Sequence, residues 1–126
     1  MKVAITSQGD SLDAPIDSRF GRCLYFIIVD LETRKIEAIP NPASGATGGA
    51  GPQAAQIIAD KGVEVVITGN VGPNAFQTLK AANVKIYKGA FGTVQETLTK
   101  YEIGELEELS NSSVLGHFGL RKDSGN

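Results

Sequence analysis

The residues with the most distinctive chemistry in this chain stand together in the segment Arg-Phe-Gly-Arg-Cys, residues 19–23. Cys23 is the single cysteine, and a thiolate is a soft ligand for iron and other thiophilic metals. Arg19 and Arg22 are close to it in sequence, and their positive charges would lower the pKa of the thiol. The segment predicts a metal ligand at Cys23, and burial of Cys23 as a small apolar side chain explains its presence equally well.

Glycine-rich segments form a second set of candidate binding groups, because their backbone amides can approach a ligand closely. Each of three such segments precedes a predicted helix, whose N-terminus presents unpaired amides and partial positive charge. Together with the arginines, these amides favour an anionic ligand; glycines that serve only as caps and arginines that serve only as surface residues remain the alternative. The candidate residues are Gly48, Gly49, Gly51, Gly69, Asn70, Gly72, Gly89 and Gly92.

Other motifs for catalysis or metal binding are incomplete. No glycine-rich loop continues into Gly-Lys-Ser or Gly-Lys-Thr, and the loop at residues 45–51 lacks the acidic partner of a dinucleotide site. Cys23 and His117 cannot supply the four ligands of a zinc finger or of a self-contained iron–sulfur site. Four aspartates suit turn formation better than a two-metal centre: Asp10, Asp13, Asp17 and Asp30.

Length and composition indicate one domain with its own core. The chain has 126 residues, of which 41% are hydrophobic, so it can fill a core without disulfides. Its net charge of -2 provides no positive field for nucleic acid or an anionic membrane. The N-terminus MKVAITS lacks the apolar stretch of a signal peptide, so we expect a cytoplasmic protein that binds neither nucleic acid nor membrane.

The hydrophobic pattern predicts the order strand, strand, strand, helix, strand, helix, strand, helix, which is an α/β fold. Residues 1–109 form this single domain, and residues 110–126, which lack a sustained period, form a loose or disordered tail that contains His117. Thr93 and Glu96 form a capping box at the last helix. The predicted strands are 2–7, 23–30, 35–39, 63–68 and 84–88, and the predicted helices are 52–61, 73–82 and 93–103.

The direction of these elements brings the candidate residues to one edge of the sheet. If the first strand runs up, the loops at 8–22 and 40–51 and the turns at 69–72 and 88–92 all lie at the upper edge. This edge is outside the carboxyl ends of the parallel strands, where open α/β sheets bind their ligands. We therefore expect the ligand there, beside the N-termini of all three helices.

Two sequence segments resemble the dinitrogenase iron-molybdenum cofactor biosynthesis family, which includes NifX, the C-terminal domain of NifB and the cluster-binding part of NafY. They are DSRFGRCLYFIIVD at 17–30 and the segment at 48–98, which begins GGAGPQAAQIIADKGVEVVITGNVGPNAF. The likeness spans about residues 1–109. It implies a ribonuclease H-like three-layer fold with a five-stranded mixed sheet. It also implies binding of an anionic iron–sulfur or molybdenum-containing cluster that is held for transfer and is not transformed.

The resemblance carries over to particular residues of this chain. It implies a site at Arg19, Phe20, Gly21, Arg22 and Cys23, with the glycine-rich segments as backbone contributors. Many relatives have His immediately before Phe-Gly, whereas this chain has Arg19. Cys23 is then the obvious soft donor that remains, and sharing of a cluster between two chains becomes possible.

The leading hypothesis is a small carrier or chaperone that is not an enzyme and that binds an iron–sulfur or iron-molybdenum type cluster, or its precursor. Its partners would be cluster donor and acceptor proteins, and the chain would be a monomer or a weak homodimer. One alternative is an enzyme or sensor that binds a small phosphate-bearing ligand at the same glycine-rich edge. Another is a regulatory protein-interaction domain without a small ligand.

Overall fold

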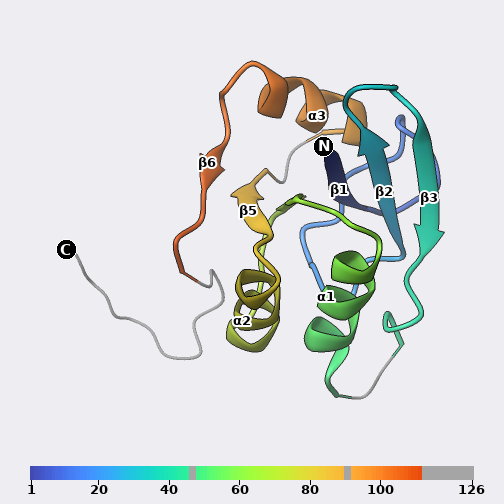
Figure 1. Ribbon diagram of the computed structural model, residues 1–126. Helices are drawn as coiled ribbons and strands as arrows, with labels where there is room; N and C mark the ends of the chain where they lie inside the picture. Colours follow the sequence, from blue (N-terminus) through green and yellow to red (C-terminus); the bar gives the residue numbers. More distant parts are fainter. Residues whose placement is uncertain (46–47, 90–91, 112–126) are drawn as a thin grey trace.

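A computed structural model describes residues 1–45, 48–89 and 92–111 of the chain (Figure 1). The strands are β1 (Lys2–Ser7), β2 (Tyr25–Asp30), β3 (Ile36–Pro40), β4 (Val65–Thr68), β5 (Lys85–Lys88) and β6 (Glu107–Glu108). The helices are α1 (Ala50–Asp60), α2 (Pro73–Ala81) and α3 (Val94–Glu102). No helix among the described residues is long and apolar enough to cross a membrane.

The strands form one mixed sheet in the order β3-β2-β1-β4-β5-β6. β1, β2 and β3 pair antiparallel, and β4 and β5 continue the sheet parallel to β1. Val3 through Ser7 of β1 and all four residues of β4 are buried, as expected for central strands covered on both faces. The ends of β1, β4 and β5 and the start of β2 therefore meet at one edge, as the sequence predicted.

Helices cover both faces of the sheet, so the molecule has three layers (Figure 1). α1 and α2 pack on one face, where Ile58 and Leu79 join Phe26 and Val66 in a buried cluster. α3 packs on the other face through Val94 and Leu98. The expected three-layer α/β fold with a mixed sheet is confirmed.

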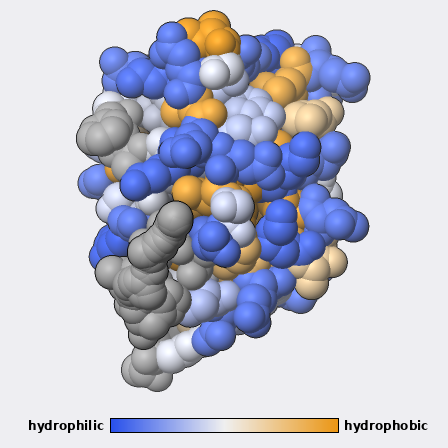
Figure 2. Space-filling view, turned by 90° about the vertical axis from the view of Figure 1, so that its left-hand side faces the viewer, coloured by the Kyte–Doolittle hydropathy of each residue, from blue (hydrophilic) through white to orange (hydrophobic). Residues whose placement is uncertain are grey.

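In the described part of the chain the sheet has six strands, and the prediction of five strands is wrong in this detail. β6 pairs antiparallel with β5 through two residues, Glu107 and Glu108. A strand of two exposed glutamates has no alternation of apolar and polar residues that could reveal it. Figure 2 shows the side of the molecule that carries β6, where hydrophilic residues surround separate apolar patches. Residues 112–126 of the predicted tail, His117 among them, lie outside the described residues.

The long loop between β1 and β2 is fixed to two other parts of the molecule. At its start, the carbonyls of Leu12 and Ala14 accept hydrogen bonds from the first amides of α3, Gln95 and Val94, at 2.9 and 3.0 Å. At its end, the Phe20 N–H donates to the carbonyl of Asn70 at 3.1 Å. The loop thus occupies a defined position along the edge where the parallel strands end.

Candidate functional site

A surface pocket of about 370 Å³ lies at this edge of the sheet, between the loop that follows β1 and the N-termini of α1 and α2. Its lining combines the Arg-Phe-Gly-Arg segment with the glycine-rich starts of the two helices. The lining residues are Arg19, Phe20, Gly21, Arg22, Gly49, Ala50, Gly51, Pro52, Asn70, Gly72, Pro73, Asn74 and Ala75.

The two helices that open onto the pocket begin without a side-chain cap. α1 starts after Gly49, which has a left-handed φ of 71° that favours glycine, and α2 starts after Gly72. Neither residue has a side chain that could bond to the amides of the first turn, and these amides have no partner within the helix. Because Pro52 and Pro73 have no N–H, the amides concerned are those of Ala50 and Gly51 in α1 and those of Asn74 and Ala75 in α2. Both helix ends therefore present hydrogen-bond donors and partial positive charge at the pocket.

α3 is built differently at its N-terminus. The Thr93 side chain accepts from the Glu96 amide at 3.1 Å, and the Glu96 carboxylate accepts from the Thr93 amide at 2.8 Å. The predicted capping box is thus confirmed, and the carbonyls of the long loop bind further amides of this turn. Because its donors are occupied, the N-terminus of α3 does not contribute to an anion site, contrary to the expectation for all three helices.

Small residues bring the three segments of the pocket into close contact. A Cβ atom added at Gly21 would lie 2.8 Å from the Gly51 nitrogen and 2.9 Å from its Cα. A Cβ atom added at Gly51 would lie 3.0 Å from the Cβ of Ala75 in α2. Larger side chains at these positions would separate the segments, so glycine here serves close packing of backbone against backbone.

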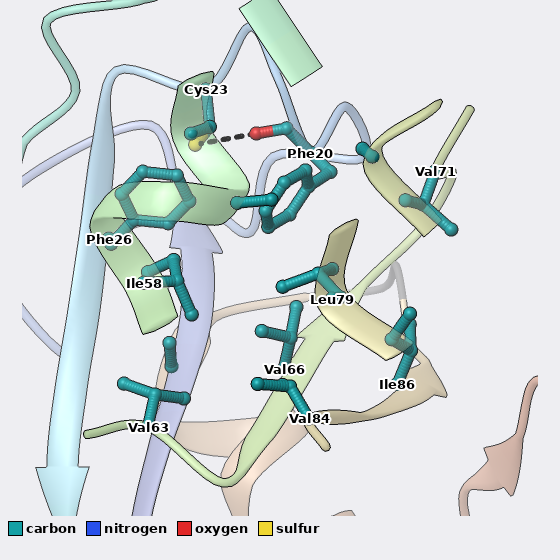
Figure 3. Packing of buried hydrophobic residues seen from close by; sticks show 14 of the residues in the cluster. Phe20, Cys23, Phe26, Ile58, Val63, Val66, Val71, Leu79, Val84 and Ile86 are labelled. Carbon is teal, nitrogen blue, oxygen red and sulfur yellow. Dashed lines mark hydrogen bonds between the residues drawn. The ribbon is translucent and has the colours of Figure 1, made fainter. Parts of the chain in front are cut away.

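Phe20 anchors the Arg-Phe-Gly-Arg segment in the core below the pocket. Its side chain is 2% exposed, and its ring centroid lies 5.6 Å from that of Phe26 in β2. Figure 3 shows Phe20 among the buried residues of the α1 and α2 face, close to Val71 and Leu79. The Asn70 amide also donates to the Ser18 carbonyl at 2.7 Å, which holds the segment against the end of β4.

The two arginines of the segment have different surroundings. Arg19 is exposed and forms an ion pair with the buried carboxylate of Asp17, with 3.1 Å between Nε and Oδ1. The hydrogen bond and the charge of Asp17 raise the pKa of Arg19 above its ordinary value. Arg22 is also exposed and donates from Nη1 to the carbonyl of Ser44 at 3.4 Å. Both guanidinium groups lie at the rim of the pocket with defined neighbours.

Cys23 lies in the core below the pocket and does not line it. Its side chain is fully buried, and Sγ donates to the Phe20 carbonyl at 3.3 Å (Figure 3). The same sulfur accepts from Asn41 Nδ2 at 3.8 Å. Burial, and secondarily the negative charge of Asp17, raises the pKa of Cys23 to about 12. The expectation that the arginines lower this pKa is therefore wrong, because desolvation of the thiolate dominates.

Several predicted residues lie at the same edge without lining the pocket. Gly48 and Gly69 flank lining residues, and Gly89 lies on the α3 side against Thr97 and Leu106. Gly92 uses its carbonyl to accept from the Ile16 amide at 3.0 Å. In the described part of the chain, no group of three His, Cys, Asp or Glu side chains could hold a metal ion.

The pocket also includes residues that were not singled out from the sequence: Ala50, Pro52, Pro73, Asn74 and Ala75. The signal that could have revealed them is the repeated Gly-Pro start of the two helix–strand units, at Gly51-Pro52 and Gly72-Pro73. In the sequence alone, this repeat indicates one local geometry that is used twice. Its significance lies in the folded chain, where the two copies adjoin across one pocket.

The lining defines what the pocket can do chemically. Its donors are backbone amides, guanidinium groups and the side-chain amides of Asn70 and Asn74, which suit an anion of diffuse charge. Among the described lining residues there is no carboxylate, histidine or thiol that could act as a general base or nucleophile. The geometry therefore supports binding of an anion.

Solved structures with the same fold are available for comparison. The chain is similar to the apo form of the orange protein from Desulfovibrio gigas, with 36% identity, a TM-score of 0.86 and coverage of 90% of this chain and 96% of that one. It is also similar to a putative NifB protein from Thermotoga assigned to the DUF35 family, with 45% identity and a TM-score of 0.81. This second match covers 91% of this chain and 98% of the other.

Sequence comparison leads to the same group of proteins. An uncharacterized protein of Methanocaldococcus jannaschii is 32% identical over 111 residues, which cover 86% of this chain and 91% of the relative. Residues 1–104, which contain the whole pocket lining, match the family described as dinitrogenase iron-molybdenum cofactor. The chain therefore belongs to the dinitrogenase iron-molybdenum cofactor family.

Proposed function

We propose that this protein is a small cytoplasmic carrier that holds an anionic iron–sulfur or molybdenum-containing cluster, or a precursor of one, for delivery to an acceptor protein. The observation that carries the proposal is the convergence of two uncapped helix N-termini and two arginines on one pocket. Family membership supports the class of cargo. The absence of acid–base or nucleophilic groups from the described lining supports a carrier over an enzyme.

In this proposal the cargo is held by hydrogen bonds and charge. The amides of α1 and α2 would contact the anionic sulfur or oxygen atoms at the surface of the cargo, and Arg19 and Arg22 would partly neutralise its charge. Cys23 is buried, so ligation through its thiolate would require the segment around Phe20 to move. Metal ligation by Cys23 stays a prediction, and binding through the pocket lining does not depend on it.

The test is anaerobic loading of the purified protein with iron and sulfide and, separately, with tetrathiomolybdate. After desalting, metal analysis and visible absorption measure what remains bound. We expect stoichiometric metal on the wild-type protein and its loss in the double variant Arg19→Ala/Arg22→Ala. Arg34→Ala is the matched control, because Arg34 pairs with Glu102 and does not line the pocket.

The same preparation distinguishes the alternatives. The wild-type protein could bind neither probe and yet bind inorganic phosphate, with phosphate binding lost in the double variant. This result would favour a phosphate-bearing ligand over a cluster. Equal loss of metal in Arg34→Ala would show that binding is not localised at the pocket. Loss in Cys23→Ala with a folded protein would assign the thiolate as a ligand and contradict binding through amides and charge alone.

A further inference from the structure

The carboxylate of Asp17 is the most buried charged group next to the pocket. Its side chain is 5% exposed, and it belongs to a neighbouring hollow whose lining includes Arg19 and Leu24. Asp17 does not line the pocket of the two helix N-termini. A buried carboxylate is unfavourable unless it is paired, so its partner is the first thing to establish.

That partner is Arg19, which surrounds the carboxylate with three hydrogen bonds. Arg19 Nε donates to Oδ1 at 3.1 Å, and Nη2 donates to Oδ2 at 3.1 Å, which makes a two-point contact. The backbone amide of Arg19 donates to Oδ1 at 2.9 Å. A two-point contact fixes the plane of the guanidinium as well as its distance, which a single hydrogen bond does not do.

Asp17 is itself attached to the central strand of the sheet. Its amide donates to the Thr6 carbonyl at 2.9 Å, and the Thr6 hydroxyl donates to the Asp17 carbonyl. The Thr6 hydroxyl also lies 2.9 Å from that of Thr68, at the end of β4. All three residues are buried, so the carboxylate has a position set by the sheet and not by the surface loop.

We propose that Asp17 is a positioning residue for anion binding, which holds the guanidinium of Arg19 in a fixed orientation at the rim of the pocket. The inference rests on the proposed function, because it gives a role to Arg19 in holding the cargo. Asp17 occupies donors on Nε and Nη2, and a guanidinium has five N–H donors, so others stay available to an anion. The exposed Arg19 side chain is thereby preorganised, so that less conformational entropy is lost when the anion binds.

The charge of Asp17 and its positioning role have opposite effects on the affinity for an anion. The proposal can therefore be tested by whether a neutral residue at position 17 strengthens or weakens binding. A negative charge near an anion site repels the anion, so a neutral residue at position 17 would tighten binding if charge were all that mattered. If Asp17 acts by orienting Arg19, the same substitution weakens binding. The weakening disappears when Arg19 is absent, because nothing is left to orient.

The experiment titrates the folded protein with tetrathiomolybdate and determines the dissociation constant for single and double variants. We expect Asp17→Asn to weaken binding about tenfold, the loss of one well-placed charged contact. Arg19→Lys, which keeps the charge but not the two-point contact, should weaken it similarly. Asp13→Asn is the matched control, since Asp13 is an exposed aspartate of the same loop, and it should change affinity less than twofold.

The double-mutant cycle decides between positioning and structural damage. In an Arg19→Ala background, Asp17→Asn should leave affinity unchanged or improve it, whereas general loss of structure would weaken binding in both backgrounds. Should Asp17→Asn fail to fold, Arg19→Lys carries the test: wild-type affinity in that variant overturns the proposal. A wild-type protein that does not bind the probe overturns the proposed function and this inference together, while normal binding by Asp17→Asn overturns this inference alone.

Discussion

At the scale of single residues, Cys23 shows how position changes the chemistry of a side chain. A cysteine close in sequence to two arginines is expected to be a reactive thiol. The sulfur of Cys23, however, is hydrogen-bonded to the Phe20 carbonyl and shielded from water. The nearby negative charge is that of Asp17, and the guanidinium of Arg19 is paired with it. Cys23 therefore behaves as a small core residue that is neutral at physiological pH.

This setting predicts a pH dependence of stability. The folded chain holds the pKa of Cys23 at about 12, against an ordinary value of 9.0, so the unfolded chain loses the proton first. The contribution to stability is complete below pH 9 and is lost as the pH rises toward 12, by about 1.4 kcal/mol per pH unit within that window.

Urea unfolding of reduced protein at pH 8, 9 and 10 measures this slope. The relevant quantity is the difference between the wild-type protein and Cys23→Ala, because it removes the contributions that both proteins share. The free energy of unfolding of the wild-type protein should fall more steeply than that of the variant above pH 9. Parallel curves would mean that the thiol is accessible and has an ordinary pKa.

At the scale of elements, α1 and α2 lack the local stabilisation that a side-chain cap at their N-termini would provide. Gly72 has extended φ and ψ of -75° and 167°, and an added Cβ would meet no atom within 4 Å. A serine at this position can therefore cap α2 without a clash. Selection for helix stability alone would favour such a residue, so the glycine is consistent with a requirement to keep the amides accessible.

Gly72→Ser should stabilise the protein and impair its proposed function at the same time. The hydroxyl would accept from amides of the first turn of α2, raising the free energy of unfolding by roughly a few tenths of a kcal/mol. Occupation of those amides should weaken binding of tetrathiomolybdate, and Gly72→Asp should weaken it further through its charge. Urea unfolding and probe titration on the same samples check both effects; a stabilised variant with unchanged affinity would exclude the α2 amides from the site.

The contact between the loop and α1 can be tested by a pair of glycine substitutions. Gly21→Ala would place a Cβ 2.8 Å from the Gly51 nitrogen, so the loop or the helix must shift, with a cost of roughly 1–3 kcal/mol in stability. Gly48→Ala meets no atom within 4 Å and should be nearly neutral. Urea midpoints of the two variants should differ clearly, and equal midpoints would mean that the close approach is not maintained in solution.

The order and type of the larger elements could be predicted from sequence because each has a strong periodic or local signal. The capping box of α3 identified its start, whereas α1 begins at Ala50, two residues before the proline that was expected to open it. β2 begins at Tyr25 and not at Cys23, and the carbonyls of Gly21 and Cys23 accept hydrogen bonds from the Asn41 side chain. Such a side-chain bridge between distant segments has no local signature.

At the scale of the whole molecule, the site depends on one face of the sheet more than on the other. The pocket lies over the α1 and α2 layer, and the amides of α3 are bound by the loop after β1. Direction of the strands alone predicted which loops share the ligand edge. Strand direction could not predict which of these loops line the pocket, because that depends on which face of the sheet each helix covers.

Hydrogen exchange measured by mass spectrometry, with and without tetrathiomolybdate, should distinguish the α1 and α2 face of the sheet from the α3 face. We expect slower exchange in peptides that cover residues 19–22, 49–53 and 70–76 when the probe is bound, because their amides line or adjoin the pocket. Peptides from α3 and β6 should exchange at the same rate in both states. Protection centred on α3 would place the ligand on the other layer and contradict the assigned site.

Two helices that start without caps have a consequence for the lifetime of the protein in a cell. On the proposed function, the cargo completes the hydrogen bonding of α1 and α2, so the loaded form is more stable, by about 2.7 kcal/mol when free cargo exceeds its dissociation constant a hundredfold. Proteases act on transiently opened chains, so the empty form would be degraded sooner. The amount of carrier would then follow the supply of cargo without a separate regulator.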